Sequence, residues 1–104
     1  MGQIIGAVQK SPLFLTQNTF MLQVQSFVFN PFQENTFVLF DETKECIIVD
    51  PGCCDEAENI QLKSFIDRNK LRVKLLLNTH CHIDHVLGNR FVKGTYKVNL
   101  LIHR

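Results

Sequence analysis

The 104-residue sequence lacks a long apolar run, an excess of charge of one sign and a regular pattern of paired cysteines. No run approaches the ~20 apolar residues that span a bilayer. Residues 1–20 lack the basic start and continuous apolar core of a signal peptide. Eleven basic and ten acidic residues are well mixed, for a net charge of +1. Charge therefore gives no reason to expect binding to nucleic acid or to a membrane.

The four cysteines are Cys46, Cys53, Cys54 and Cys81. Their spacing fits neither a disulfide framework nor a Cys-x-x-Cys zinc site, and a disulfide between the adjacent Cys53 and Cys54 would be strained. We therefore expect reduced thiols in a cytoplasmic protein. Cys81 stands between two histidines, where a metal would lower its thiol pKa. The alternative is that Cys81 is a small buried apolar side chain.

The length allows one domain, and the order of apolar segments predicts an α/β fold. A phase slip in the first strand predicts a bulge at Gln25-Ser26. Asp55, with Glu58 three residues later, resembles a capping box that begins a helix, and Gly94 is expected to end a second helix. Residues 1–20 form a leader that is either a poorly ordered arm or a read-through upstream of Met21. Strands are expected at residues 22–29, 36–40, 46–49, 73–77 and 98–102, with helices at 55–69 and 85–93.

A cluster of metal-binding residue types follows the fourth expected strand. His80 and His82 are two residues apart, so in an extended segment both imidazoles project to one side and can reach one metal at about 2.0–2.1 Å. Asp84 and His85 follow where the chain turns into a helix, and they can be directed at a second metal. Imidazole with carboxylate suits zinc, with iron and manganese as alternatives. Solvated loop histidines are the competing interpretation.

The segment His80-Cys81-His82-Ile83-Asp84-His85 resembles the His-x-His-x-Asp-His signature of the metallo-β-lactamase superfamily. Gly88-Asn89 is similar to the continuation found in its glyoxalase II-like branch. Upstream, residues 30–36 and 48–52 are similar to the family's opening hairpin and Asp-Pro-Gly turn. The resemblance covers residues 21–104 and implies the N-terminal half of an αββα sandwich, in which a mixed β-sheet carries helices on one face.

The resemblance also implies a reaction and its residues. One or two zinc ions would be bound by His80 and His82 at a first site and by Asp84 and His85 at a second. Metal-bound hydroxide would then hydrolyse a small-molecule thioester or ester, in the manner of a hydroxyacylglutathione hydrolase. Asp84 would be the catalytic residue that orients this hydroxide. Asp50 would fix the loop beneath the site, unless it is a plain turn-former before Pro51.

Family members are longer, and their second half normally supplies further metal ligands that have no counterpart here. His103 is expected to be structural rather than a ligand. The missing half would also leave one sheet face open at Phe37, Leu39 and parts of Leu75-Leu76-Leu77, which predicts self-association. Whether these 104 residues are an active enzyme thus stays open. The alternatives are a catalytically silent metal-binding or interaction module, a non-functional fragment, and an iron-dependent persulfide dioxygenase.

Overall fold

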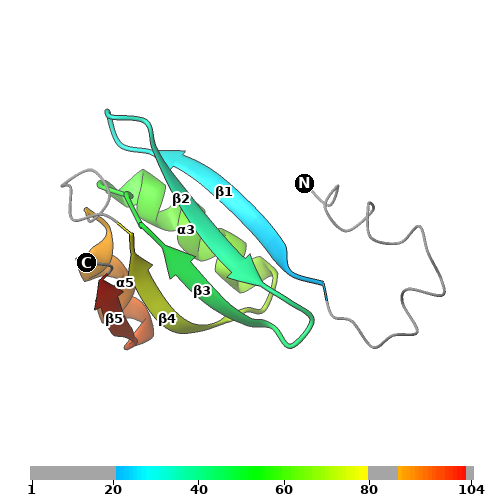
Figure 1. Ribbon diagram of the computed structural model, residues 1–104. Coiled ribbons are helices and arrows are strands. Elements are labelled where there is room, and N and C mark those ends of the chain that lie inside the picture. Colours follow the sequence, from blue (N-terminus) through cyan, green and yellow to red (C-terminus); the bar gives the residue numbers. More distant parts are fainter. Residues whose placement is uncertain (1–20, 80–86, 103–104) are drawn as a thin grey trace.

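The computed structural model describes residues 21–79 and 87–102, which form one mixed sheet with two helices (Figure 1). The strands lie in the order β1-β2-β3-β4-β5. β1 to β3 are antiparallel neighbours, whereas β3, β4 and β5 are parallel. The element order and the α/β class predicted from the sequence are confirmed. The elements are β1 (Gln23–Phe29), β2 (Glu34–Phe40), β3 (Glu45–Val49), α3 (Glu56–Arg68), β4 (Arg72–Asn78), α5 (Asn89–Tyr96) and β5 (Asn99–Ile102).

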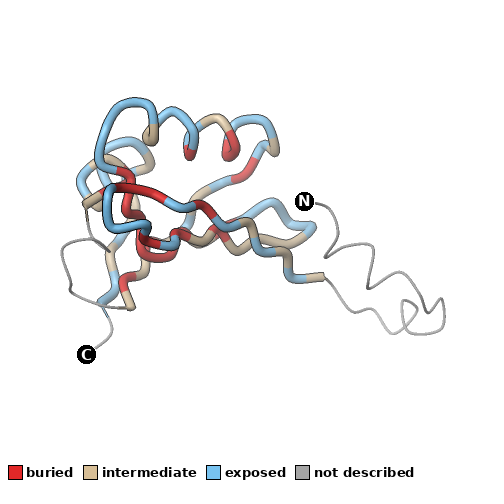
Figure 2. Tube along the Cα trace, turned by 90° about the horizontal axis from the view of Figure 1, so that it is seen from above, coloured by how far each residue is buried: buried red, intermediate tan, exposed pale blue. Residues whose placement is uncertain are grey.

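One hydrophobic core joins the sheet to both helices. Figure 2 shows that the buried positions gather where the helices and the strands face each other. Phe65 of α3 meets Phe27 of β1 edge-on, with ring centroids 5.7 Å apart. Ile48 of β3 and Leu76 of β4 are fully buried in the same cluster. Burial of each such side chain contributes about 1.5–3 kcal/mol, so this face holds the helices on the sheet. Among the described residues no helix is long and apolar enough to cross a membrane.

Helix α3 begins at the predicted cap, and its predicted apolar stripe (Leu62, Phe65 and Ile66) is buried. The Asp55 side chain accepts a hydrogen bond from the Glu58 backbone N–H at 2.8 Å. The reciprocal half of the capping box is shifted, because the Glu58 carboxylate accepts from the Cys54 N–H at 2.9 Å. Asn69 is the C-cap residue, and its Nδ2 donates to the Phe65 carbonyl at 2.8 Å.

The predicted bulge at Gln25-Ser26 is wrong. β1 pairs with β2 residue for residue from Gln23 to Phe29. The irregular apolar pattern has another cause: Phe27 and Phe29 are buried against the helices, while the alternate residues Val24 and Val28 are exposed on the opposite face. The sheet's register shift lies elsewhere, between Cys46 and Ile47 where β3 pairs with β4.

Gly94 does not end the second helix, since α5 begins at Asn89 and continues through Gly94 to Tyr96. Lys97 ends it in the left-handed conformation, with φ 56° and ψ 48°, and donates its N–H to the Lys93 carbonyl at 2.9 Å. A glycine inside a helix costs only about 1 kcal/mol relative to alanine, which the packing of Val92 in the core outweighs.

The second face of the sheet is apolar and carries no helix in the described part of the chain. Cross-strand register places Val24 beside Leu39, Leu39 beside Ile47 and Ile47 beside Leu75 on this face. Val24 is 37% exposed and Leu101 is 52% exposed. Phe37 and Leu39, expected to lie open, are half-buried by their neighbours in the sheet. We call this surface the open face; its residues are Val24, Val28, Phe37, Leu39, Ile47, Leu75, Leu77 and Leu101.

Candidate metal centre

The predicted metal ligands His80, His82, Asp84 and His85 lie outside the described residues, as do Cys81 and His103. The structure describes the chain on both sides of the ligand segment, at Thr79 and again from Leu87. The contacts that hold the chain on both sides of this segment can therefore be described.

The start of the ligand segment is attached to Asp50. This residue follows β3, is 4% exposed and has a left-handed φ of 53°, a conformation that Asp adopts more readily than most residues. Its backbone N–H donates to the Leu77 carbonyl at 2.8 Å. Its carboxylate accepts the Thr79 N–H at 2.7 Å and also the Thr79 hydroxyl. Asp50 therefore fixes the backbone immediately before His80, which agrees with the loop-fixing role that the resemblance implied rather than with a plain turn-former.

The end of the segment is attached to the next residue of the same turn. The Gly88 N–H donates to the Pro51 carbonyl at 2.7 Å. A Cβ at position 88 would lie 2.7 Å from that oxygen and 2.6 Å from the Cys53 Sγ. Gly88 has φ −91°, so glycine is required here for close approach rather than for its backbone angles. Asp50 and Pro51 thus hold the two ends of the ligand segment.

Thr36 forms hydrogen bonds to the turn at residues 50–52, and this role was not identified from the sequence. It is fully buried, and its hydroxyl lies 2.8 Å from both the Asp50 carbonyl and a Glu34 carboxylate oxygen, which share its single proton as acceptors. The same hydroxyl accepts the Gly52 N–H at 2.9 Å. Thr36 lies within the 30–36 segment that carried the family resemblance, but nothing in that segment indicated its contact with the turn.

Asn30, in the turn between β1 and β2, contacts both the turn at residues 50–52 and Glu58 of α3. Asn30 has a left-handed φ of 60°, and its Nδ2 donates to the Gly52 carbonyl at 2.9 Å. Its backbone N–H donates to the Glu58 carboxylate at 2.8 Å. The two upstream segments that carried the resemblance, residues 30–36 and 48–52, therefore meet at one end of the sheet, beside Thr79 and Gly88.

Within the described ranges, one group of three potential metal ligands lies close together: Cys54, Asp55 and Glu58, with ligand atoms within 4.8 Å of one another. Asp55 and Glu58 already accept hydrogen bonds at the start of α3. Desolvation, followed by the Glu58 and Asp55 carboxylates, raises the pKa of Cys54. Because Asp55 and Glu58 both accept backbone N–H groups at the start of α3, we assign this group to helix capping.

The three described cysteines are free, as predicted. Burial raises the pKa of Cys46 to about 12. Burial, with a smaller contribution from nearby carboxylates, also raises the pKa of Cys53 to about 12. Both thiols are packing groups and remain protonated near neutral pH.

Residues 29–104 match the sequence model described as the metallo-beta-lactamase superfamily. Among curated relatives, a hydroxyacylglutathione hydrolase of Buchnera aphidicola is 37% identical over 57 residues, which cover 55% of this chain and 21% of the relative. The hydroxyacylglutathione hydrolase GloC of Haemophilus influenzae is 36% identical over 69 residues, covering 66% of this chain and 31% of the relative. The chain thus spans less than a third of either relative.

Solved structures share the fold. A B3 metallo-beta-lactamase called BLEG-1 superimposes with a TM-score of 0.68 and 28% identity, over 75% of this chain and 35% of the other. ETHE1 from Myxococcus xanthus superimposes with a TM-score of 0.61 and 18% identity, over 75% of this chain and 34% of the other. The mixed sheet with its two helices therefore corresponds to part of a larger fold.

Proposed function

The chain belongs to the metallo-beta-lactamase superfamily, and from this premise we propose that it carries the metal-binding segment of a zinc-dependent hydrolase acting on small-molecule thioesters or esters. The observation that supports this most directly is the turn at Asp50 and Pro51, which holds both ends of the histidine segment. Because this turn holds the chain at Thr79 and at Gly88, on both sides of the segment, it suits the support of metal ligands.

The donor set fits a divalent metal. Three imidazoles and one carboxylate lie within six residues, and these donors suit zinc, with iron and manganese as alternatives. In our proposal His80 and His82 hold one ion, and Asp84 and His85 hold a second. A divalent ion bound there would supply an acidified water and a Lewis acid for the substrate carbonyl. Asp84 would also orient the attacking water.

The surrounding residues have positioning roles. Asp50 holds the Thr79 backbone, and Thr36 and Asn30 hold the turn that contains Asp50. These groups are buried or partly buried, so water does not compete for their hydrogen bonds. We infer that they keep the start of the ligand segment in one conformation before metal arrives.

Thioester hydrolysis is favoured as the reaction because both curated relatives above are named hydroxyacylglutathione hydrolases. The persulfide dioxygenase alternative would use iron and oxygen. A silent metal-binding module would use the same ligands without turnover. We also propose a cytoplasmic location, which agrees with the three free thiols.

Metal analysis combined with an activity assay tests the proposal. Elemental analysis of the purified chain should report zinc, and His82→Ala should reduce the zinc content. Hydrolysis of a hydroxyacyl-glutathione thioester by the wild type, absent in His82→Ala, would support the hydrolase. Zinc without turnover would favour the silent module, and iron with oxygen consumption would favour the dioxygenase. A chain that takes up no divalent metal would overturn the metal centre.

We further propose that the chain self-associates through the open face. Leu101 and Val24 are exposed on it, and its residues are apolar on all five strands. Light scattering at micromolar concentration should show species larger than a monomer, and Val24→Lys should shift them toward the monomer. Ile60→Lys is the matched control, because Ile60 is 54% exposed on α3 and away from the open face. A monomeric wild type would contradict the proposal.

A further inference from the structure

Two asparagine side chains join the ends of the ligand segment directly. Asn78 is the last residue of β4 and is fully buried, and Asn89 is the first residue of α5. Asn89 Nδ2 donates to Asn78 Oδ1 at 2.7 Å, and Asn78 Nδ2 donates to Asn89 Oδ1 at 3.2 Å. Each amide therefore donates to and accepts from the other, which fixes the orientation of both groups.

The asparagine pair helps to position the start of α5, because this helix lacks a side-chain cap. The residue before the helix, Gly88, provides no side-chain hydrogen bond to cap it. The position of the first turn is set instead by the Gly88–Pro51 hydrogen bond and by the amide pair. The Asn78–Asn89 contact also differs from the Asp50 and Pro51 contacts, because it links the two ends of the segment to each other rather than to a third element.

We propose that Asn78 and Asn89 are positioning residues that fix the separation between the end of β4 and the start of α5, and thereby raise the metal affinity of His80, His82, Asp84 and His85. This inference rests on the proposed function. A segment with fixed ends loses less conformational entropy when its ligands are ordered around an ion. Neither asparagine needs to touch the metal for this effect.

The side-chain chemistry at these positions is specific. An amide has both a donor and an acceptor on one planar group, so two amides form a reciprocal pair without any charge. Alanine at position 89 removes both hydrogen bonds and leaves the buried Asn78 amide without these two contacts. Serine at position 89 is too short to span the distance, but it keeps a polar side chain at the first residue of α5.

Zinc affinity, measured by competition with a chromophoric chelator, tests the proposal. Asn89→Ala should weaken zinc binding about tenfold, the lower end of the range for loss of a group that supports metal ligands. The matched control is Asn69→Ala, which removes an amide hydrogen bond of 2.8 Å to the Phe65 carbonyl at the far end of α3. This control should leave zinc affinity unchanged. If the alanine variant at position 89 does not fold, the same measurement is made on Asn89→Ser.

A positioning role is separated from a structural one by two further readouts. The visible spectrum of the Co²⁺-loaded chain should change in Asn89→Ala and stay unchanged in Asn69→Ala. Asn78→Ala with Asn89→Ala should weaken zinc binding no more than the larger single effect, because the two residues act as one unit. Equal zinc affinity and equal cobalt spectra in wild type and Asn89→Ala would overturn this inference alone. A wild type that binds no metal would overturn the proposed function as well.

Discussion

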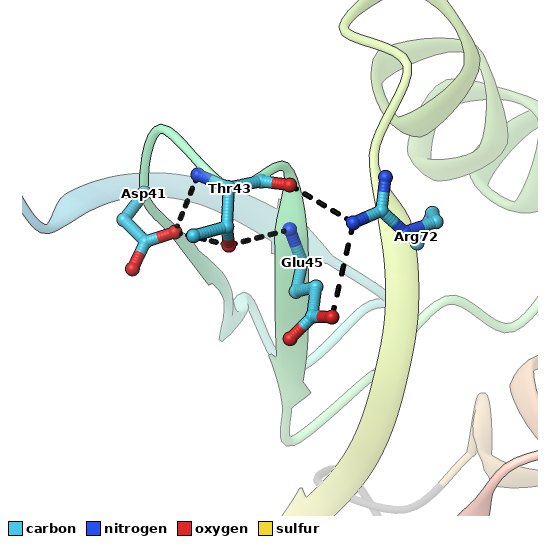
Figure 3. Close-up of polar contacts among 4 residues, drawn as sticks. All are labelled: Asp41, Thr43, Glu45 and Arg72. Atoms are coloured by element: carbon cyan, nitrogen blue, oxygen red, sulfur yellow. Dashed lines mark hydrogen bonds and ion pairs between the residues drawn. The ribbon is translucent and has the colours of Figure 1, made fainter.

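The two ends of the parallel strands β3 and β4 use the same hydrogen-bond chemistry in opposite environments. At one end, the Asp50 carboxylate accepts both the N–H and the hydroxyl of Thr79. At the other end, Asp41 Oδ1 accepts the N–H of Thr43 at 2.9 Å and its hydroxyl at 2.6 Å (Figure 3). The first pair spans 29 residues and is part-buried, whereas the second spans two residues and is exposed.

The Asp50–Thr79 contacts hold together segments that are distant in the sequence, whereas the Asp41–Thr43 contacts only shape a local turn. Asp41 and Thr43 shape the local connection between β2 and β3, where Lys44 has a left-handed φ of 72°. Arg72 adds a hydrogen bond to the Thr43 carbonyl at 3.0 Å and an ion pair with Glu45 at 3.7 Å, both exposed. Water can replace each of these contacts at little cost. At the Asp50 end, loss of the carboxylate would leave groups that water reaches poorly.

The largest effect should come from Asp50→Ala. It removes two hydrogen bonds to Thr79 and places alanine at a left-handed φ, so the free energy of unfolding should fall by about 3 kcal/mol. Asp41→Ala is the matched control and should cost clearly less, because water replaces its exposed hydrogen bonds to Thr43. Urea unfolding of both variants measures the difference. Equal losses would show that burial does not distinguish the two ends.

The next effect concerns two glycines of the α5 region. Gly88→Ala should destabilise by about 2 kcal/mol, because the added Cβ meets Pro51 and Cys53. Gly94→Ala should stabilise by about 0.5–1 kcal/mol, because a Cβ there has open space and alanine favours a helix. Thermal unfolding midpoints should therefore move in opposite directions. Movement in the same direction would contradict the close contact at Gly88.

Alkaline pH should weaken the fold through the buried thiols and Tyr96. Burial raises the pKa of Cys46 and Cys53 from 9.0 to about 12, and desolvation raises the pKa of Tyr96 from 10.0 to about 12. Between pH 9 and 12 the folded state keeps protons that the unfolded state releases, so stability is full below pH 9 and falls as pH rises. Urea midpoints at pH 8 and pH 10 measure this fall. A constant midpoint would indicate that the folded state releases these protons too.

The smallest effect should come from Arg72→Ala at the exposed end. Its ion pair with Glu45 has side chains 61% and 50% exposed, so the free energy of unfolding should change by less than about 1 kcal/mol. The change should shrink further in 1 M salt, because salt screens exposed charges. A loss comparable with that of Asp50→Ala would remove the contrast between the two ends. Chemical unfolding at low and high salt provides the measurement.

Periodicity and caps were sufficient to predict the type and order of the elements, although not the end of α5, which continues through Gly94 to Tyr96. Leu62, Phe65 and Ile66 share a helical spacing, and all three are buried. Asp55 is the cap that its sequence position indicated. These features depend on neighbours within one or two turns, so the sequence displays them directly. The error at Gln25-Ser26 arose because a strand with apolar residues on both faces gives no clean alternation.

The supporting contacts of the candidate centre could not be predicted in the same way. Thr36 reaches Asp50 across 14 residues, Asp50 reaches Thr79 across 29, and Asn78 reaches Asn89 across 11. No local pattern links such pairs, because each depends on how strands are ordered in the sheet. The ligand types at His80, His82, Asp84 and His85 were visible in the sequence, and their metal binding stays a prediction.

β3 pairs antiparallel with β2 and parallel with β4, which has a consequence for how the chain folds. The β1–β2–β3 meander closes through short turns, whereas β4 reaches β3 only after the chain has passed through α3. Short loops close at lower entropic cost than long crossovers. The meander should therefore form early, and β4 and β5, which precede and follow the segment that contains the histidines and α5, should dock onto it last, in the slower step of folding.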